Sequence, residues 1–505
     1  MGEVEPYNPF KDPNVISVHI ILPVFLLIIT PSTLFFFFLI KRVSSKSSKR
    51  QTATVLVLGD VGRSPRMMYH VDSLARHGWS TYLVGFQDTD PIQSLMENPR
   101  VHLLGLEKPP KFVGSLPWVF RATLGAVFQT VSAFYICIWK IPYNTEILLV
   151  QNPPAIPTLA LAQFVCLVTK TKLVIDWHNT GYSLLALRVG KRSMLVKIAK
   201  WFESTFGRSA YAHIFVTRAL EEYLVREWRL EGRKTVLHDR PPPHFHRTDP
   251  VNQHLLMTRL IPELDAPFPP ELSLKESNCA VFTKVSDTTH LPVLKPDRPA
   301  LVVSSTSWTV DEDFSLLVTA LDAYQSARDS GSPLTKLIVL VTGMGSLRAP
   351  FEKIVAEREG SQWKDIIVRC VFLPANDYPT LLGCADLGVS LHSSSSGRDL
   401  PMKVVDMFGC GVPVLARNFA CIDELVKEGR NGMVFNTGEE LGTQMIDLLS
   451  SFPSSEKLAK LRSFFDMGAK TEKNTFSSDT EKDEWLTWEE NWNKIIYNGI
   501  LAKIR

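Results

Sequence analysis

The segment most informative about the fold is "ADLGVSLHSSSSGRDLPMKVVDMFGCGVPVLARN", residues 385–418. An apolar segment runs into four serines and a glycine, and an Asp-Leu-Pro step then leads into residues with helical spacing. Gly409 and Gly411 follow, and a second apolar segment begins. This order of strand, loop, helix and strand is typical of a parallel sheet covered by helices. We expect Asp399 to cap the helix and Pro401 to lie in its first turn.

The same alternation of apolar runs and helical stretches recurs along most of the chain. We expect buried strands at residues 52–62, 80–86, 146–154, 171–178, 300–308, 336–345, 365–373, 385–394, 412–418 and 432–435. A proline-rich region without clear periodicity, residues 240–300, separates the two groups of strands. The sequence therefore predicts an α/β protein with two Rossmann-like, doubly wound domains that face a cleft, and with ligands at the carboxyl ends of the strands.

The predicted domain boundaries follow from these segments. The first domain covers residues 53–300 and includes the irregular connection at 240–300. The second domain covers residues 301–480. Residues 481–505 form a C-terminal helix, and we expect it to return to the first domain.

The N-terminal segment at residues 17–40 is apolar and carries no formal charge. Roughly 20 apolar residues span a bilayer, so this segment predicts a transmembrane anchor. A cleaved signal peptide would be shorter and would carry its basic residues in front. Here the basic residues come afterwards, in the tether at 41–52, and acidic residues dominate residues 1–16. The positive-inside rule therefore places residues 1–16 in the lumen and the body of the chain in the cytosol.

Charge and cysteine content exclude two classes of function. The net charge is only +3 over 505 residues, which gives no basis for attraction to nucleic acid. The seven cysteines form no CxxC pair, which argues against a zinc site or a thiol redox motif and favours free thiols in a reducing compartment.

A second apolar region, residues 112–140, has two interpretations. Arg121 and Gln129 interrupt it, and Trp118 and Trp139 lie near its ends. It is either an amphipathic surface in contact with lipid or a buried helix pair.

The serine loop, residues 392–400, predicts a phosphate site at the start of the following helix. Free backbone N–H groups and the positive end of the helix dipole attract a phosphate there. Lys403 adds a full positive charge one turn into the helix, and Asp406 can accept hydrogen bonds from ribose hydroxyls. The alternative is an ordinary surface helix with an Asp399–Lys403 ion pair. A second hydroxyl-rich loop, residues 303–309, ends the first strand of the same domain, and the two loops together can hold a diphosphate, as in the nucleotide-sugar half of a GT-B glycosyltransferase.

Six motifs make the resemblance to a known family specific. They are "VLVLGDVGRSPRMMYH", "QNPPAIPT", "LVIDWHNTGYS", "SSTSWTVDEDF", "NDYPTLLGCADLGVSLHSSSSGRDLPMKVVDMFGCGVPV" and "ELVKEGRNGMVF", which run from about residue 55 to 435. In this order they resemble the motifs of the chitobiosyldiphosphodolichol β-mannosyltransferases. The resemblance implies a GT-B fold and transfer of mannose from GDP-mannose to dolichyl-diphosphate chitobiose, as the first mannosylation of the N-glycan precursor. It also implies a β1,4 linkage formed with inversion, on the cytosolic face of the endoplasmic reticulum.

The donor side is assigned to the two hydroxyl-rich loops and the helix that follows. The predicted donor-binding residues are Ser305, Thr306, Ser307, Trp308, Ser394, Ser395, Ser396, Gly397, Arg398, Lys403 and Asp406. Two of the loops depart from the family pattern. Arg398 stands where the family usually has leucine, and Met344 stands where it usually has lysine between two glycines. We hypothesise that Arg398 partly replaces the missing lysine.

The acceptor side is assigned to the loop after the first strand and to Asn179. Its predicted members are Gly62, Arg63, Ser64, Arg66 and Asn179, with the two arginines meeting the acceptor diphosphate. An inverting transfer needs a general base to remove the proton of the acceptor hydroxyl. Asp60 and His178 each end a strand and are the two candidates.

Two Asp-x-Asp matches, residues 88–90 and 311–313, raise the question of a metal. The first precedes Pro91 in a turn, and the second opens a helix, where acidic residues complement the dipole. We therefore expect no metal site and no required cofactor, because a helix start, lysine and arginine can meet the phosphate charge.

Two other functions stay open from the residues. One alternative is another GT-B transferase with a different lipid-linked acceptor. The other is a weakened paralogue that acts as a scaffold for neighbouring transferases of the dolichol pathway. In each case the predicted location is the endoplasmic reticulum membrane, with one membrane pass.

Overall fold

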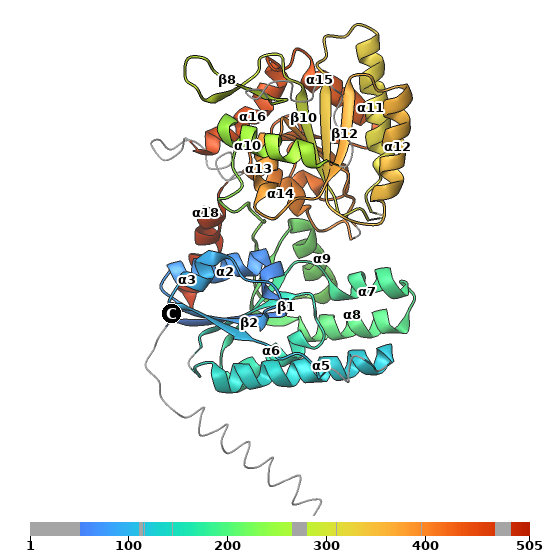
Figure 1. The fold of residues 1–505 in the computed structure, drawn as a ribbon. Helices are drawn as coiled ribbons and strands as arrows, with labels where there is room; N and C mark the ends of the chain where they lie inside the picture. The colour runs from blue at the N-terminus through green and yellow to red at the C-terminus, as the bar shows by residue number, and fades with distance from the viewer. Residues whose placement is uncertain are drawn as a thin grey trace, which may run out of the picture. The chain divides into compact units, whose positions relative to one another are not determined.

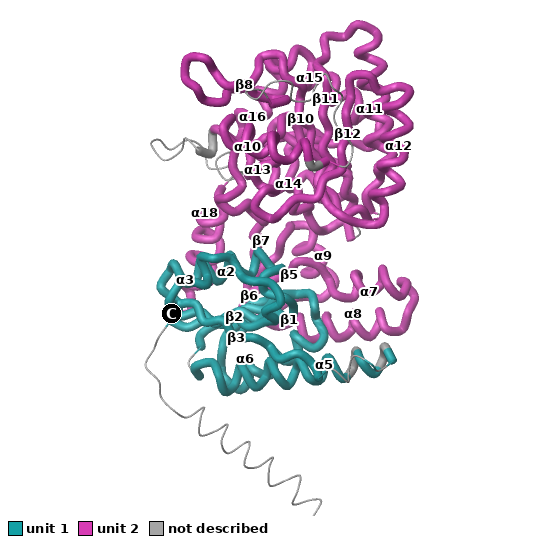
Figure 2. The backbone as a smooth tube through the Cα atoms, in the orientation of Figure 1, with its two compact units in different colours: residues 1–175 teal, residues 176–505 magenta. Residues whose placement is uncertain are grey.

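The computed structural model describes residues 51–110, 115, 117–143, 145–264, 280–309, 311–394, 396–469 and 486–504 (Figure 1). The chain divides into two compact units, residues 1–175 and 176–505 (Figure 2). The predicted anchor at residues 17–40, together with residues 1–16 and most of the tether, lies outside the described residues. Within the described ranges, no helix combines the length and the apolar character needed to cross a membrane.

Strands and helices alternate through most of the chain. The strands are β1 (Thr52–Asp60), β2 (Ser80–Phe86), β3 (Val101–Gly105), β4 (Ile147–Asn152), β5 (Lys172–Trp177), β6 (Ser209–Phe215), β7 (Glu231–Val236), β8 (Thr283–Val285), β9 (Pro292–Leu294), β10 (Ala300–Ser305), β11 (Leu337–Thr342), β12 (Ile366–Val371), β13 (Leu387–Ser390), β14 (Val414–Arg417) and β15 (Gly432–Phe435). The helices are α2 (Pro65–Arg76), α3 (Gln93–Glu97), α5 (Trp118–Tyr135), α6 (Thr158–Thr169), α7 (Gly181–Val189), α8 (Met194–Phe206), α9 (Arg218–Trp228), α10 (Pro250–Leu260), α11 (Phe314–Asp329), α12 (Arg348–Ser361), α13 (Asp377–Cys384), α14 (Met402–Gly409), α15 (Gly438–Leu449), α16 (Glu456–Ala469) and α18 (Trp488–Trp492).

The strands form two large sheets, as predicted. The first has the order β3-β2-β1-β4-β5-β6-β7, and the second has the order β12-β11-β10-β13-β14-β15. β1 pairs in parallel with β2 and β4, and β10 pairs in parallel with β11 and β13. Each of the ten predicted strand segments contains a strand of the structure.

The second sheet reverses its direction of winding between β10 and β13. The chain runs outward from β10 to β12 and then returns to the other side of β10. Ligands in open α/β sheets bind outside the carboxyl ends of strands at such a switch point. The loops that leave β10 and β13 there are the two hydroxyl-rich loops of the sequence.

Two hydrophobic cores cover the two faces of this sheet. Alternate residues of β10 point to opposite faces, so Ala300 and Val302 join one core while Leu301 and Val303 join the other. The first core contains side chains of α11, α12, α15 and α16, and the second contains side chains of α10, α13 and α14. This double covering explains why the strands are continuously apolar.

The connection predicted to be irregular, residues 240–300, contains regular elements. α10 begins after Asp249, whose side chain accepts hydrogen bonds from the N–H groups of Val251 (2.9 Å) and Asn252 (3.0 Å). Leu256 and Met257 of α10 are buried in the core of the second sheet. β8 and β9 then form an antiparallel hairpin. Packing against a sheet that follows later in the chain stabilises α10, which its weak periodicity did not predict.

The apolar region at 112–140 forms α5 and a short π-helix at Ile136–Lys140. On one side α5 packs on α6, with the rings of Phe134 and Phe164 5.8 Å apart. Five large apolar side chains are nevertheless exposed on its other side, namely Phe120, Leu124, Val127, Val131 and Tyr135. The region is therefore neither wholly buried nor polar on its outer face.

The C-terminal segment is helical at both ends of its described part and reaches the first sheet. It contains α18, a π-helix at Asn493–Tyr497 and a 3-10 turn at Leu501–Lys503. The hydroxyl of Tyr211 in β6 donates a hydrogen bond to the carbonyl of Lys503 (3.2 Å), and the guanidinium of Arg233 in β7 donates one to the carbonyl of Gly499 (3.2 Å). The predicted return is confirmed for residues 486–504.

Candidate functional site

The serine loop after β13 is organised by Asp399. The carboxylate accepts hydrogen bonds from the hydroxyls of Ser394 and Ser396, the latter at 3.0 Å. Gly397 has a positive φ of 67°, which favours glycine, and its N–H donates to the Ser394 hydroxyl at 2.8 Å. Ser395 lies outside the described residues.

Asp399 does not cap the helix, so that prediction is wrong. The N-cap of α14 is Pro401, which has no side-chain donor or acceptor, and the helix begins at Met402. The first turn of α14 therefore presents backbone N–H groups that no side chain caps. The start of α9 differs, because the carboxylate of Glu424 accepts hydrogen bonds from Arg218 N (2.7 Å) and Ala219 N (2.9 Å). Of these two helix starts, only that of α14 is available to an anion.

Lys403 forms an ion pair with Glu312 rather than with Asp399. The distance from Lys403 Nζ to Glu312 Oε1 is 2.6 Å, and the Glu312 side chain is 1% exposed. The second carboxylate oxygen of Glu312 accepts a hydrogen bond from Ser307 N at 2.9 Å. The Asp399–Lys403 pair belonged to the alternative interpretation as an ordinary surface helix, and the structure does not form it, since Asp399 lies before the helix. Glu312 instead connects α14 to the loop after β10.

The loop after β11 packs against the loop after β10 through two glycines. A Cβ atom at Gly343 would lie 2.1 Å from the Thr306 carbonyl, and one at Gly345 would lie 2.5 Å from the Ser307 carbonyl. The Thr306 hydroxyl also donates to the Thr342 carbonyl at 3.1 Å. Met344, between the two glycines, is 62% exposed. Both glycines are thus required for this close approach, whereas packing does not constrain the exposed side chain at 344 in the same way.

Trp308 belongs to the core, which corrects its assignment to the donor. Its side chain is fully buried and stacks on Phe314 with ring centroids 4.5 Å apart. Its backbone lies in the left-handed region, with a φ of 55°. Ser305 is also buried and accepts a hydrogen bond from the Tyr378 hydroxyl at 3.1 Å. In the loop after β10, the groups that can contact a ligand are therefore the backbone and the small side chains.

Asp406 lies on α14 and is partly buried. Burial, together with the negative charge of Asp239, raises the pKa of its carboxyl to about 7. No hydrogen bond to its carboxylate is found within the described part of the chain. A carboxylate that pays for burial without a partner is typical of a binding site, where a ligand supplies the missing donors.

We expect Asp406→Asn to stabilise the free protein in alkaline solution. The unfolded carboxyl ionises near 3.8, but the folded one keeps its proton to about pH 7. Ionisation of this carboxyl therefore lowers the free energy of unfolding progressively between about pH 4 and pH 7. Above about pH 7 the loss of stability is complete and no longer changes with pH. Thermal unfolding at about pH 8 should show a higher midpoint for Asp406→Asn than for wild type, and no difference below about pH 4. The exposed Asp423→Asn is the control. A pH-independent difference would contradict the assigned cause.

Arg398 is held by an aromatic ring from the end of the first sheet. Its guanidinium carbon lies 3.8 Å from the ring centroid of Tyr223 in α9, and its carbonyl accepts a hydrogen bond from the Thr217 hydroxyl at 2.6 Å. The Tyr223 hydroxyl is 2.5 Å from the hydroxyl of Tyr182 at the start of α7. Arg398 therefore links the serine loop to the segment that contains His178 (residues 176–182).

Arg398→Leu removes this stack and should weaken donor binding. A cation–aromatic contact of this kind contributes about 1 kcal/mol, so we expect the KM for the predicted sugar-nucleotide donor to rise about fivefold. Arg430→Leu is the matched control, because its guanidinium also lies over a ring, that of Phe464 at 5.5 Å, in a different part of the domain. An unchanged KM would contradict both the linking role and the hypothesis that Arg398 compensates for Met344.

His178 forms a dyad with a buried carboxylate. Its Nε2 lies 2.8 Å from Asp176 Oδ2, and Asp176 is fully buried whereas the His178 side chain is 24% exposed. Such a carboxylate fixes the imidazole so that Nε2 carries the proton and Nδ1 is the free base. Next to the dyad, Asn179 accepts a hydrogen bond from Thr180 N at 2.8 Å. The geometry of His178 fits a general base.

Asp60, the other candidate base, is engaged in its own loop. It accepts hydrogen bonds from the Thr89 hydroxyl (2.7 Å), Thr89 N (3.1 Å) and Asp88 N (3.3 Å). The bond from the Thr89 hydroxyl is the main reason that the pKa of Asp60 falls below its usual value. A carboxylate with a lowered pKa and filled acceptor sites is a weak base, so the geometry favours His178.

The predicted acceptor-side arginines differ from each other. The Arg63 side chain is 81% exposed, with its Nε 3.5 Å from Asp60 Oδ2, whereas Arg66 is buried. Gly62 is required by close packing, because a Cβ there would lie 2.5 Å from the Thr89 carbonyl. The Ser64 hydroxyl donates to the Asp60 carbonyl at 3.2 Å. Arg63 is thus the accessible cation of this loop, and Arg66 contributes to the interior.

The two Asp-x-Asp segments have structural roles. Asp313 caps α11 by accepting a hydrogen bond from Ser315 N at 3.1 Å, which confirms the predicted helix start. Asp88 pairs with Lys108 in a bend before Pro91. Among the described residues, no group of three or more His, Cys, Asp or Glu is arranged to hold a metal ion.

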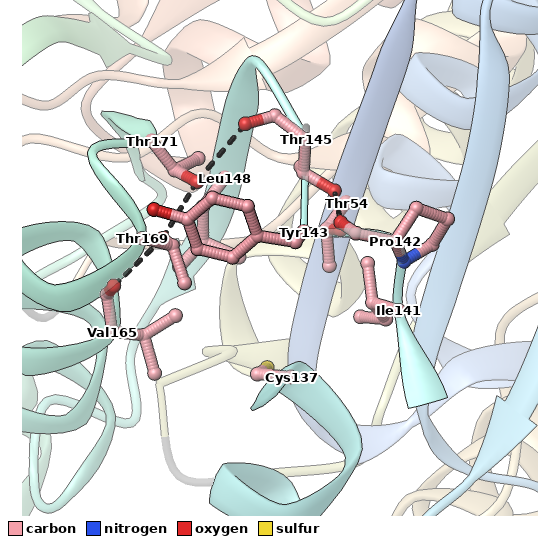
Figure 3. Close-up of a pocket in the computed structure, with 10 residues that line it drawn as sticks. All are labelled: Thr54, Cys137, Ile141, Pro142, Tyr143, Thr145, Leu148, Val165, Thr169 and Thr171. Atoms are coloured by element: carbon pink, nitrogen blue, oxygen red, sulfur yellow. Dashed lines mark hydrogen bonds between the residues drawn. The ribbon is translucent and has the colours of Figure 1, made fainter. Parts of the chain in front are cut away.

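Two cavities differ in size and in the residues that line them. One lies at the amino-terminal end of β1 and β4, where the hydroxyls of Thr169 and Thr171 are hydrogen-bonded at 2.7 Å (Figure 3). Its volume of about 10 Å³ is enough for one water and no substrate. A larger cavity of about 290 Å³ lies beside the serine loop. It is lined by Arg218, Ala219, Glu222, His238, Ala420, Cys421, Asp423, Glu424 and Lys427.

Several residues of this arrangement were not predicted, namely Asp176, Tyr182, Tyr223, Glu312 and Tyr378. For two of these residues, the sequence contained a pattern that could have identified them. Asp176 is two residues from His178 and thus on the same side of the strand end, and Glu312 lies within a motif already singled out. The aromatic residues had no such pattern, because their partners are distant in sequence.

Comparison with known proteins places this architecture in a class. Residues 300–451 match the family of glycosyl transferases group 1. The sucrose-phosphate synthase of Thermosynechococcus elongatus has the same fold, with a TM-score of 0.56 at 13% identity, over 90% of this chain and 100% of that one. Two Rossmann-like α/β sheets, with hydroxyl-rich loops at the switch point of the second, define a GT-B glycosyltransferase.

Two relatives narrow this class. The chitobiosyldiphosphodolichol beta-mannosyltransferase of Homo sapiens is 41% identical over 87% of this chain and 90% of its own length. The UDP-glycosyltransferase TURAN of Arabidopsis thaliana is 38% identical over 81% of this chain and 90% of its own length. The chain belongs to the chitobiosyldiphosphodolichol beta-mannosyltransferase family.

Proposed function

We propose that this chain transfers mannose from GDP-mannose to dolichyl-diphosphate chitobiose and forms a β1,4 linkage with inversion. The family supports the sugar and the acceptor, because its human member is named for both. The observation that carries the proposal is the link from Arg398 through Tyr223 to Tyr182. It joins the loop suited to a sugar nucleotide to the segment that contains the Asp176–His178 dyad.

His178 acts as the general base in this proposal. Nδ1 of the imidazole removes the proton of the acceptor hydroxyl as its oxygen attacks the anomeric carbon of mannose. Asp176 stabilises the imidazolium that forms. The leaving diphosphate is held by the N–H groups at the start of α14 and by Lys403, and Asp406 accepts hydrogen bonds from the ribose hydroxyls. Attack opposite the leaving group inverts the configuration at the anomeric carbon.

We propose that no divalent metal is obligatory, because Lys403 and the start of α14 meet the diphosphate charge. Residues 17–40 would anchor the chain in the endoplasmic reticulum membrane, with the two α/β domains on the cytosolic side. Activity that disappears in EDTA and returns only with Mn²⁺ would contradict the first statement.

The donor is tested by a panel of sugar nucleotides with the purified full chain and a synthetic chitobiosyl diphosphate lipid. We expect product from GDP-mannose and none from UDP-glucose or UDP-N-acetylglucosamine. The name of the Arabidopsis relative makes the UDP-sugars the necessary comparison. Product from a UDP-sugar alone would mean a different transferase. No product from any donor, with the fold intact, would favour a scaffold.

A further inference from the structure

The hairpin formed by α7 and α8 exposes an unusual number of large apolar side chains. The two helices lie side by side (Figures 1 and 2). Residues 190–193 join them, and the φ of 85° at Gly190 suits glycine. Seven large apolar side chains are exposed on the hairpin, namely Leu184, Leu187, Val189, Met194, Leu195, Ile198 and Trp201. Exposed apolar patches of this kind mark contact surfaces.

The same hairpin is strongly basic. Residues 184–201 contain five basic residues and no aspartate or glutamate. The five are exposed, namely Arg188, Lys191, Arg192, Lys197 and Lys200. Of these, Arg188, Lys191, Arg192 and Lys197 form no ion pair within the described part of the chain. The charge is therefore available to a partner.

We propose that the α7–α8 hairpin docks on the surface of an anionic lipid bilayer. Apolar side chains that enter the acyl boundary, beside lysines and arginines that meet lipid phosphates, are typical of interfacial helices. Trp201 is of the residue type that prefers the headgroup level. A second copy of this chain fits poorly, because it would bring five more positive charges against the first five.

Docking there would place the dyad close to the lipid surface. α7 begins at Gly181, directly after the segment with His178, and its first N–H groups are fixed by the buried Glu203, at 2.8 Å for Gly181 N and 3.1 Å for Tyr182 N. The hairpin is thus firmly joined to the segment with the candidate base. That this position brings the dyad to a membrane-embedded polyprenyl diphosphate acceptor rests on the proposed function. Lipid binding by the hairpin does not depend on it.

Hydrogen–deuterium exchange of the full chain in lipid nanodiscs tests the docking without turnover. Nanodiscs of phosphatidylcholine are compared with nanodiscs that also contain phosphatidylinositol. We expect peptides within 184–201 to be protected only with the anionic lipid, and this protection to disappear in Arg188→Glu/Lys191→Glu/Arg192→Glu. Quenching by brominated lipid should fall in Trp201→Phe relative to wild type. Equal exchange of these peptides in both kinds of nanodisc would overturn the proposal. Protection that grows with protein concentration in detergent would also overturn it, because it would indicate that a second copy of the chain covers the hairpin.

An activity assay separates the docking from the chemistry. In Leu187→Glu/Met194→Glu/Ile198→Glu we expect the apparent KM for a bilayer-embedded acceptor to rise about tenfold, because apolar contacts become charged and repel anionic lipid. The KM for a water-soluble acceptor with a short lipid chain should stay unchanged. Leu255→Glu, at an exposed leucine of α10, is the control. Equal loss with both acceptors would overturn the proposal.

Discussion

His178→Ala is expected to lower kcat by about a thousandfold while leaving GDP binding intact, because a positioned general base contributes roughly 10²- to 10⁴-fold. The dyad geometry gives the reason, since Asp176 holds Nε2 at 2.8 Å and leaves Nδ1 to the acceptor hydroxyl. Asp176→Asn should reduce kcat as well, since an amide can hold the opposite tautomer. Steady-state kinetics and calorimetric titration with GDP provide the two measurements.

Two controls make this result specific. His254→Ala removes another partly exposed histidine, hydrogen-bonded to the Thr283 hydroxyl at 2.8 Å on α10, and should leave kcat unchanged. Asp60→Asn should change kcat only a few fold, because the Asp60 carboxylate serves its own loop. Near-wild-type turnover of His178→Ala would remove the dyad from the mechanism, and a large loss in Asp60→Asn would restore the rival base.

Lys403→Met is expected to weaken both folding and donor binding. It leaves the buried Glu312 carboxylate without its cation, and breaking a buried pair in this way costs about 3 kcal/mol. It also removes the positive charge next to the diphosphate site, so we expect the KM for the donor to rise more than about tenfold. Thermal unfolding and donor kinetics measure the two effects.

The double variant Lys403→Met/Glu312→Gln separates the two roles of the lysine. Replacing the buried carboxylate by an amide removes the unpaired charge, so stability should largely return. The KM should remain high, because the cation is still absent. If the double variant restored the KM together with stability, Lys403 would act only through the fold.

The fold was predictable because strand and turn signals agreed along the chain. Runs such as 337–341 are continuously apolar, and a glycine follows two residues later at Gly343. These two signals identified buried parallel strands without any tertiary information. α10 was not predicted because its stability comes from packing against the second sheet, which begins 40 residues after the last turn of the helix at Leu260. Local propensity does not contain that contact.

The loops of the site were predictable from the sequence, whereas the residues that contact Lys403 and Arg398 were not. The hydroxyls, Lys403 and Asp406 were assigned from a loop-helix pattern that is local in sequence. The partner of Lys403 lies 91 residues away, and Tyr223 lies 175 residues from Arg398, so their pairing depends on the arrangement of the sheets. Trp308 was assigned wrongly because an aromatic residue in a polar loop favours ligand contact, whereas its side chain is buried in the core and stacks on Phe314.

The chemical structure of the reaction product decides whether this chain is a β1,4-mannosyltransferase. The full chain is incubated with GDP-mannose and chitobiosyl diphosphate lipid, and the released oligosaccharide is analysed by NMR. We expect a trisaccharide with one mannose in the β configuration, linked to position 4 of the terminal N-acetylglucosamine. An α-linked mannose, a different linkage position or the absence of any trisaccharide would contradict the proposed function.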